Sequence, residues 1–334
     1  MIRIGKISYW HVHAWDYTKQ AQEHPDTEIA AVWDEVGDRG IAAAEKLDVP
    51  YYSSLEEMLQ REDLDAVIVD APTTMHQEVM IAAARAGKHI FTEKVIAPTL
   101  KEVNAILDEV TRNNVKLTVS LPRLNDGYTL AIRDILSQGL LGKTTLVRAR
   151  LSHNGATASW LPEHFYSLEE CGGGALIDLG CHPMYLARLF LGEMPSTVSA
   201  QYGYVTGKQV EDNAVSLLSV PTGAIGIVEA GFVNNHSPFT LEVHGTEGTL
   251  LYGTPDNKLL LRSSVDGGKG IEQWAELPIP NARESAFHQW VNHIENDTSA
   301  DENINLAVDL TRLIEASNLS ARERRVVRLD ELQA

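Results

Sequence analysis

Several groups of residues in this chain have types and spacings that suit chemistry. Asp178 and His182 follow three glycines at residues 172–174 and are four positions apart. On one helix this spacing places both side chains on the same face, although Pro183 removes a helix hydrogen bond and predicts a break near Gly180. The glycines allow the backbone to turn tightly beside a bound molecule. An aspartate that caps a helix and a histidine in the core would give the same pattern.

A second group is His11-Val-His13, which follows the first predicted strand. Two imidazoles separated by one residue can share a metal, as in metal-dependent hydrolases that carry this pattern at the end of a barrel strand. Such an enzyme needs further ligands, for which His76, His153 and Asp178 are candidates. The β-rich second half of the chain does not continue the strand–helix alternation of that barrel. A metal-dependent hydrolase that uses His11 and His13 is therefore the alternative to the assignment below.

The elements that position these residues differ between the two parts of the chain. Over the first 120 residues, short apolar runs alternate with helical patterns, and residues 65–70 are apolar on both faces, as in a central parallel strand. This alternation predicts a doubly wound parallel sheet with right-handed crossovers. The predicted strands are residues 2–8, 28–34, 65–70, 89–92 and 115–121, and the predicted helices are residues 14–24, 40–47, 77–86 and 100–114.

From about residue 123 the sequence becomes β-rich. Short turns, among them Asp256-Asn257 and residues 266–268, join successive strands, so the second sheet is predicted to be mostly antiparallel. We therefore predict an α/β fold with a dinucleotide-binding domain at residues 1–121 and an α+β domain with an open sheet at residues 122–334. The predicted strands of the second domain are residues 144–153, 198–205, 213–220, 224–233, 240–243, 249–252 and 258–262, and its helices are residues 128–138, 284–296 and 306–324.

Ligands of an open α/β sheet bind beyond the carboxyl ends of its strands. Those ends here carry residues 8–13, Asp34, residues 71–76 and the pair Glu93-Lys94. Asp34 stands 26 positions after the start of the first loop, close to the spacing of a carboxylate that binds the ribose of a dinucleotide, although a helix cap would also suit it. Lys94 is the best catalytic candidate, because a partly desolvated ammonium in the crevice can hydrogen-bond a substrate hydroxyl and a ribose.

Four strings, in this order, resemble the Gfo/Idh/MocA family of sugar and inositol oxidoreductases. They are APTTMH at residues 71–76, AGKHIFTEK at residues 86–94, GGGALIDLGCH at residues 172–182 and ARERRVV at residues 321–327. The resemblance implies a Rossmann domain, a second α+β domain, and nicotinamide-dependent hydride transfer on a sugar, inositol or related polyol. NAD is expected in preference to NADP, because Asp34 and Glu35 repel a 2′-phosphate and the nearest arginine, Arg39, stands five positions beyond Asp34.

The chain departs from this family at two places. Ser8, Trp10 and His13 stand where the family has the glycines of Gly-x-Gly-x-x-Gly, and Trp10 is expected to crowd the pyrophosphate. Either the cofactor then sits differently, with a histidine of this loop donating to a phosphate, or it is not bound. Val95 follows Lys94 where the family has a proline, often after a cis peptide bond, and a cis bond before valine costs roughly 2.5–4 kcal/mol.

The resemblance also implies roles for individual residues. His182 becomes the general acid/base, Asp178 binds a substrate hydroxyl and Lys94 polarises the reacting oxygen. The expected cofactor-binding residues are Ser8, Tyr9, Trp10, His11, His13, Asp34, Ala71, Pro72, Thr73, His76, Glu93, Lys94 and Arg123, and the expected substrate-binding residues are Lys94, Arg123, Trp160, His164, Asp178 and His182. No metal is expected, because Lys94 and His182 supply the base and the electrostatic partner that hydride transfer needs.

Composition narrows the classes of partner. The chain has 28 Lys and Arg against 46 Asp and Glu, and a net charge of −18 repels nucleic acids and anionic membranes. Cys171 and Cys181 indicate no disulfide framework and suit a reducing cytoplasm, and no stretch predicts a membrane span or a secretion signal. We expect a cytoplasmic homodimer or homotetramer that pairs through its C-terminal sheet. A non-catalytic dinucleotide-binding protein is the second alternative.

Overall fold

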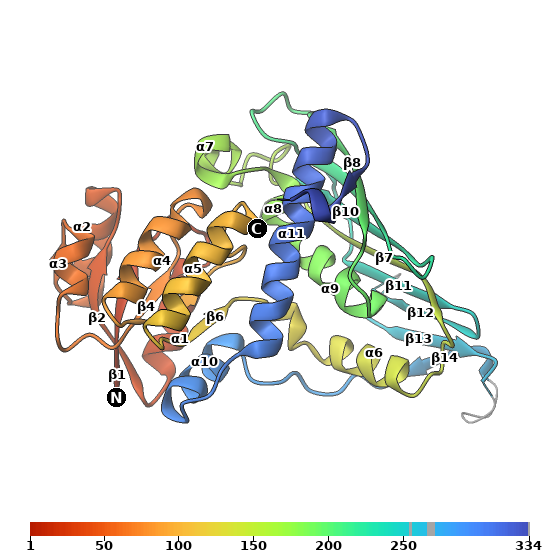
Figure 1. Cartoon of the computed structure of the whole chain (residues 1–334), viewed down its shortest axis with the longest axis horizontal. Helices are drawn as coiled ribbons and strands as arrows, with labels where there is room; N and C mark the ends of the chain where they lie inside the picture. Colours follow the sequence, from red (N-terminus) through yellow and green to blue (C-terminus); the bar gives the residue numbers. More distant parts are fainter. Residues whose placement is uncertain (254–255, 266–270, 333–334) are drawn as a thin grey trace. The chain divides into compact units, whose positions relative to one another are not determined.

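The structure is a computed structural model of the chain (Figure 1). It describes residues 1–253, 256–265 and 271–332. The chain divides into two compact units. The first unit contains Met1–Ser120 and Glu284–Val308, and the second contains Leu121–Arg283 and the chain from Asp309 onward. The predicted turn at residues 266–268 lies outside the described residues.

The first unit is built on a parallel sheet, as predicted. In the described part of the chain it has six strands in the order β3-β2-β1-β4-β5-β6. The order reverses between β1 and β4, and the carboxyl ends of the strands at such a point form the ligand crevice of an open α/β sheet. The strands are β1 (Ile2–Ile7), β2 (Thr27–Trp33), β3 (Tyr51–Tyr52), β4 (Ala66–Val69), β5 (His89–Thr92) and β6 (Leu117–Val119).

Helices accompany this sheet, and most of them begin and end within three residues of the predicted bounds. The helix α5 begins with a capping box, in which Thr99 and Glu102 satisfy backbone N–H groups of its first turn. It packs beside α4 (Figure 1). Prediction missed β3 and α3, which are too short to show a hydrophobic period. The helices of the first unit are α1 (Ala14–Glu23), α2 (Gly37–Leu47), α3 (Leu55–Leu59), η1 (Thr73–Met75), α4 (His76–Arg85), α5 (Leu100–Arg112) and α10 (Ala286–Glu295).

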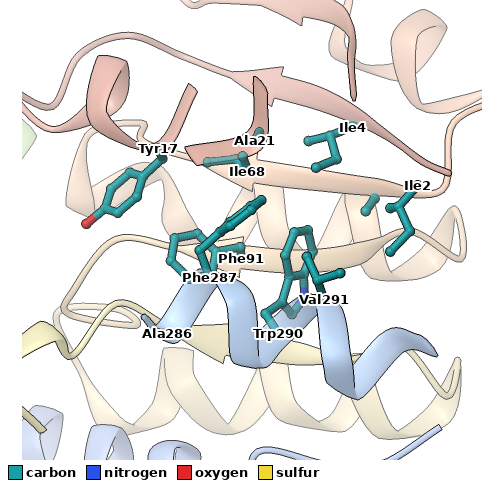
Figure 2. Close-up of a cluster of buried hydrophobic side chains, with 11 residues drawn as sticks. Ile2, Ile4, Tyr17, Ala21, Ile68, Phe91, Ala286, Phe287, Trp290 and Val291 are labelled. Carbon is teal, nitrogen blue, oxygen red and sulfur yellow. The ribbon is translucent and has the colours of Figure 1, made fainter. Parts of the chain in front are cut away.

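Residues 284–308, which the sequence analysis assigned to the second domain, belong to the first unit. Figure 2 shows the reason: α10 places Phe287 and Trp290 against Phe91 of β5 and Ile4 of β1. The side chain of Trp290 is fully buried, and its ring lies 5.7 Å from that of Phe91. Burying an aromatic side chain of this size contributes about 3 kcal/mol or more, so the amphipathic helix packs on the sheet that covers its apolar face.

The second unit contains a mixed, mostly antiparallel sheet, as predicted. Its order in the described residues is β14-β13-β12-β11-β7-β10-β9-β8-β15, and the pair β7 and β10 is parallel. Buried and exposed residues alternate along β9, so one sheet face is left uncovered there. The strands are β7 (Thr144–Ser152), β8 (Thr197–Gly203), β9 (Asn213–Ser219), β10 (Ile225–Gly231), β11 (Thr240–Gly245), β12 (Gly248–Tyr252), β13 (Leu259–Ser263), β14 (Ile271–Leu277) and β15 (Val327–Arg328).

One helix of the second unit, α9, is buried along most of its length and packs on β7 and β10. The long helix α11 begins in the first unit and continues in the second. Within the described residues, no helix combines the length and the apolar composition that crossing a membrane requires. The helices are η2 (Pro122–Leu124), α6 (Gly127–Ser137), η3 (Glu163–Tyr166), α7 (Leu168–Cys171), α8 (Ala175–Asp178), α9 (Cys181–Leu191), α11 (Asp301–Glu323) and η4 (Leu329–Glu331).

Candidate active site

The loop after β1 makes the tight turn of a phosphate loop without a glycine. Ser8 has φ 68°, in the left-handed region that favours glycine, and its Oγ accepts a hydrogen bond from the Trp10 N–H at 3.1 Å. The indole of Trp10 is buried, with 5% of the residue exposed. The N-cap residue of α1, His13, makes no side-chain capping bond in the described structure. A tight turn followed by the N-terminus of a ten-residue helix fits a phosphate group of a dinucleotide.

Asp34, the predicted ribose ligand, is held by four donors of the protein. Its Oδ2 accepts from the Tyr9 N–H and from Arg39 Nε, and its Oδ1 accepts from the Val36 N–H and from Arg39 Nη2, each at 2.8 Å. A carboxylate has about four lone-pair sites. Arg39 also pairs with Glu35, and these pairings outweigh burial and raise the pKa of the guanidinium. Arg39, five positions beyond Asp34 in the sequence, thus contacts it in the structure, because the chain turns back at the start of α2.

Glu93 is the centre of a buried network at the end of β5. Its Oε1 accepts from the Tyr17 hydroxyl at 2.6 Å and lies 3.6 Å from His11 Nδ1, while its Oε2 accepts from the Lys94 N–H at 2.6 Å. Burial favours the neutral acid, but His11, Lys94, His13 and the Tyr17 hydroxyl together lower the pKa of Glu93 to about 2. Lys94 is 6% exposed. Glu93 is therefore a buried carboxylate that stays ionised.

The Lys94–Val95 peptide bond is cis, although valine replaces the family's proline. His76 holds this segment in place. Its Nδ1 lies 3.0 Å from the carbonyl oxygen of Val95 and 3.1 Å from that of Ile96, and its Nε2 lies 3.1 Å from that of Ala71. The structure thus gives His76 a positioning task, and its expected contact with the cofactor stays a prediction. Two other expected cofactor residues, Ala71 and Pro72, are buried, and Thr73 is half-buried at the start of η1.

Sequence reasoning missed a buried ion pair beneath this edge. Lys6 of β1 is fully buried and pairs with Asp70, which follows β4. Burial lowers the pKa of Lys6 well below its ordinary value, although Asp34 and Glu93 act in the opposite direction. A lysine in the middle of an apolar strand pattern is the sequence signal that could have revealed it, because a buried ammonium requires a partner.

In the second unit, a buried carboxylate shapes the segment that carries the predicted acid/base. Glu211 accepts hydrogen bonds from the N–H groups of Gly174 and Leu176, both at 2.9 Å, and so caps α8. Gly172 has φ 72°, and a Cβ on Gly174 would lie 2.1 Å from the carbonyl oxygen of Glu211. Burial raises the pKa of Glu211 to about 7, although its backbone hydrogen bonds oppose the rise. The glycines therefore let the chain approach Glu211 closely.

Asp178 and His182 lie on two short helices, as the predicted break near Gly180 requires. Asp178 ends α8, Gly180 is the N-cap of α9, and His182 lies in the first turn of α9. Both predicted site residues are half-buried. His182 Nδ1 lies 3.4 Å from the hydroxyl of Tyr185, which is fully buried. Burial raises the pKa of that hydroxyl, so it stays protonated.

Tyr185 also connects His182 to Arg123, which sequence reasoning placed near the cofactor and substrate. The Tyr185 hydroxyl accepts from the Arg123 N–H at 3.0 Å. The guanidinium of Arg123 donates to the Tyr128 hydroxyl at 3.3 Å and lies 4.2 Å from the ring centre of Phe239. Tyr185 is thus a residue that sequence reasoning missed, and its position one helical turn after His182 was the available signal.

The other expected substrate residues form a separate group. Trp160 is 54% exposed, its Nε1 donates to Asn154, and its ring lies 4.6 Å from that of His153. Burial lowers the pKa of His153, while the charge of Asp178 acts in the opposite direction. The ring of His164, in η3, lies 5.0 Å from that of Phe165 and is tilted against it. Trp160 thus contacts His153, and the charge of Asp178 acts on the same histidine.

The chain combines a parallel sheet of the dinucleotide-binding type with an open, mostly antiparallel sheet. Lys94 belongs to the first unit, and Asp178 and His182 belong to the second. This combination is typical of a two-domain oxidoreductase. Residues 1–121 match the oxidoreductase family with an NAD-binding Rossmann fold, and residues 129–251 match the GFO/IDH/MocA C-terminal domain. The chain belongs to the Gfo/Idh/MocA family of oxidoreductases, and its N-terminal domain is the NAD-binding Rossmann domain of that family.

Individual relatives support this assignment. The chain is 30% identical to the 1,5-anhydro-D-fructose reductase of Ensifer adhaerens over 231 residues, which are 67% of this chain and 68% of that protein. It is 25% identical to the myo-inositol 2-dehydrogenase of Thermotoga maritima over 92% of both chains. Its fold matches a levoglucosan dehydrogenase solved with NADH and levoglucosan, with a TM-score of 0.82, 20% identity and coverage of 98% of this chain and 99% of that one.

Proposed function

We propose that the protein transfers a hydride between NAD and a secondary alcohol or ketone carbon of a sugar, inositol or related polyol. The observation that carries this proposal is the buried Glu93-Lys94 pair at the carboxyl end of β5, on the sheet edge where a dinucleotide fold holds its cofactor. The relatives support the substrate class, because they are named as reductases and dehydrogenases of sugars and inositols.

In this proposal the polar groups of the two units have different tasks. NAD supplies the hydride acceptor when it is bound. As the substrate carbon loses its hydride, His182 takes the hydroxyl proton at the imidazole nitrogen that does not face Tyr185, so that a ketone and a protonated His182 result. The Lys94 ammonium polarises the reacting oxygen and hydrogen-bonds a cofactor ribose. Asp178 holds a neighbouring hydroxyl, and Tyr185 orients the ring of His182.

The test is a titration with NADH and NADPH followed by fluorescence, and then an assay of NAD reduction on a panel of inositols, aldoses and anhydrosugars. The proposal expects saturable NADH binding and turnover on at least one member of the panel. Binding without turnover on any member would support a non-catalytic dinucleotide-binding protein instead. If neither NADH nor NADPH binds, the loop at Ser8 does not bind a nicotinamide cofactor and the proposal fails.

We further propose that the protein acts in the cytoplasm as a homodimer or homotetramer that pairs through the C-terminal sheet. Cys171 and Cys181 are buried and form no disulfide with each other, which suits a reducing compartment. On the uncovered sheet face, Val215, Leu217 and Ile225 are 36–44% exposed, and an apolar face of this kind favours association. Light scattering of the purified protein tests this: a monomer at micromolar concentration contradicts it.

A further inference from the structure

Two histidines and a glutamate come together at the carboxyl edge of the first unit. His11 and His13 belong to the loop after β1, and Glu93 follows β5. One potential ligand atom from each of the three lies within 4.8 Å of the others. His11 Nδ1 is already 3.6 Å from Glu93 Oε1, and the two imidazole rings are 5.2 Å apart. Ligand atoms around a zinc ion at ~2.1 Å lie ~3.4 Å from one another, so His11 and Glu93 already have the necessary spacing.

The third ligand, His13, is held less firmly by its surroundings than the other two. The side chain of His13 is 51% exposed, so its movement is not limited by packing in the core. By contrast, His11 is 7% and Glu93 2% exposed. Two ligands are therefore fixed by their surroundings and one is adjustable, which suits a site that captures an ion from solvent.

Each of two ligands also has a partner that orients it. His13 Nδ1 lies 2.9 Å from Asp16 Oδ2, and a carboxylate at one ring nitrogen directs the other towards a metal. The Tyr17 hydroxyl donates to Glu93 Oε1 at 2.6 Å and lies 2.6 Å from Ser120 Oγ. Such outer partners are a regular part of metal sites.

The charges at this position favour a cation. Glu93 supplies a carboxylate that is only 2% exposed. Asp16 adds a second carboxylate beside His13. Lys94 is the neighbouring cation, and its backbone N–H donates to Glu93 Oε2 at 2.6 Å. A divalent ion is attracted to these two carboxylates.

We propose that His11, His13 and Glu93 bind one divalent transition-metal ion of the zinc class and leave a coordination position open to an oxygen ligand. Two imidazoles and one carboxylate form a donor set that zinc, iron and manganese accept, whereas magnesium and calcium prefer oxygen alone. The sequence analysis expected no metal because hydride transfer needs none. That argument applies only to the hydride step. This loop can still bind an ion that takes no part in hydride transfer.

The experiment uses the full chain, treated with a chelator, dialysed and kept free of nucleotide. Titration with Zn²⁺ alone, followed by calorimetry and by elemental analysis after gel filtration, is expected to give one ion per chain. Replacement of the bound ion by Co²⁺ is expected to give visible absorption bands typical of imidazole and carboxylate ligands. His13→Ala is expected to weaken Zn²⁺ binding at least ~10-fold, because it removes a direct ligand.

Control variants keep the result interpretable. His13→Ala changes a half-exposed side chain, so circular dichroism is expected to show a folded protein. His236→Ala changes an exposed histidine of the second unit and is expected to bind Zn²⁺ as the parent does. Glu93→Gln provides a second test at a buried ligand. The proposal is overturned if no stoichiometric ion binds, or if His13→Ala and His236→Ala bind it equally. NADH titration of the same samples reports separately on the proposed function.

Discussion

The carboxyl edge of the first sheet and the glycine-rich segment of the second unit hold their polar residues in different ways. At the first edge, charged groups are buried and already paired: Asp34 with Arg39, and Lys6 with Asp70. In the second unit, Asp178 and His182 are half-buried at the ends of two short helices. One region is an ionic framework, and the other presents groups that can exchange protons with a bound molecule.

In the proposed mechanism, this difference separates the binding of the cofactor from the transfer of the proton. A cofactor site benefits from fixed charges, because a preorganised framework loses little entropy on binding. A general acid/base needs partial access to substrate and a pKa near neutrality. Glu211 and Tyr185 of the second unit are buried and need no access to substrate. Glu211 holds the backbone at Gly174, and Tyr185 contacts the ring of His182.

The largest expected effect is that of His182→Ala. If the second unit supplies the proton acceptor, kcat falls by about 10²–10⁴-fold, which is the usual contribution of a positioned acid/base. The dissociation constant of NADH stays within about twofold, because the Rossmann domain holds the cofactor. Steady-state kinetics and fluorescence titration measure the two quantities, and His236→Ala is the control. Near-normal turnover would show that another residue carries the proton.

Lys94→Ala is expected to weaken NADH binding and to lower kcat. It therefore differs from His182→Ala, which is expected to lower kcat alone. The ammonium is assigned to the reacting oxygen and to a ribose, so kcat falls by about 10²-fold and NADH binding weakens as well. Lys101→Ala, at an exposed lysine of α5, is the control. Unchanged NADH affinity in Lys94→Ala contradicts the role of this lysine at the ribose.

Glu211 makes stability depend on pH. Its folded-state pKa is about 7 against an ordinary 4.5, so the folded protein binds this proton more tightly than the unfolded chain does. The stabilising contribution is therefore complete below about pH 4.5 and is lost as pH rises through about 7, by up to ~3 kcal/mol. Denaturant titrations of the parent and of Glu211→Gln at about pH 5 and about pH 8 measure it.

We expect the free energy of unfolding of the parent to fall more than that of Glu211→Gln between these two pH values. The glutamine variant is also less stable overall, because an amide cannot accept from the Gly174 and Leu176 N–H groups with both of its polar atoms. Glu169→Gln, at an exposed residue of α7, is the control. Equal pH dependence in the parent and Glu211→Gln would remove Glu211 as the titrating group.

The smallest expected effect concerns the choice of cofactor. Asp34, Glu35 and Arg39 together carry one net negative charge, which disfavours a 2′-phosphate even though an arginine is present. Glu35→Gln removes that charge and is expected to narrow the preference for NADH over NADPH by about threefold to fivefold, the size of a partly screened charge interaction. Glu45→Gln on α2 is the control, and an unchanged ratio of dissociation constants contradicts the argument.

The sequence by itself determined the fold class and most elements, because the periods of its apolar residues are local properties. The alternation over the first 120 residues and the β-rich runs beyond them predicted both sheets, and the Pro183 and Gly180 positions predicted the break between α8 and α9. The family strings also identified Glu93, Lys94, Asp178 and His182 as the residues on which to build a site.

Only the tertiary structure decided which partners these residues have. Nothing in the spacing of Glu211 indicates that it caps a helix 36 positions earlier, at Ala175, and nothing in α10 indicates that Trp290 packs on β5. Burial, and with it every pKa shift described above, depends on neighbours that are distant in the chain. For the same reason the sequence suggested a metal for His11 and His13, but only the fold brought Glu93 to them.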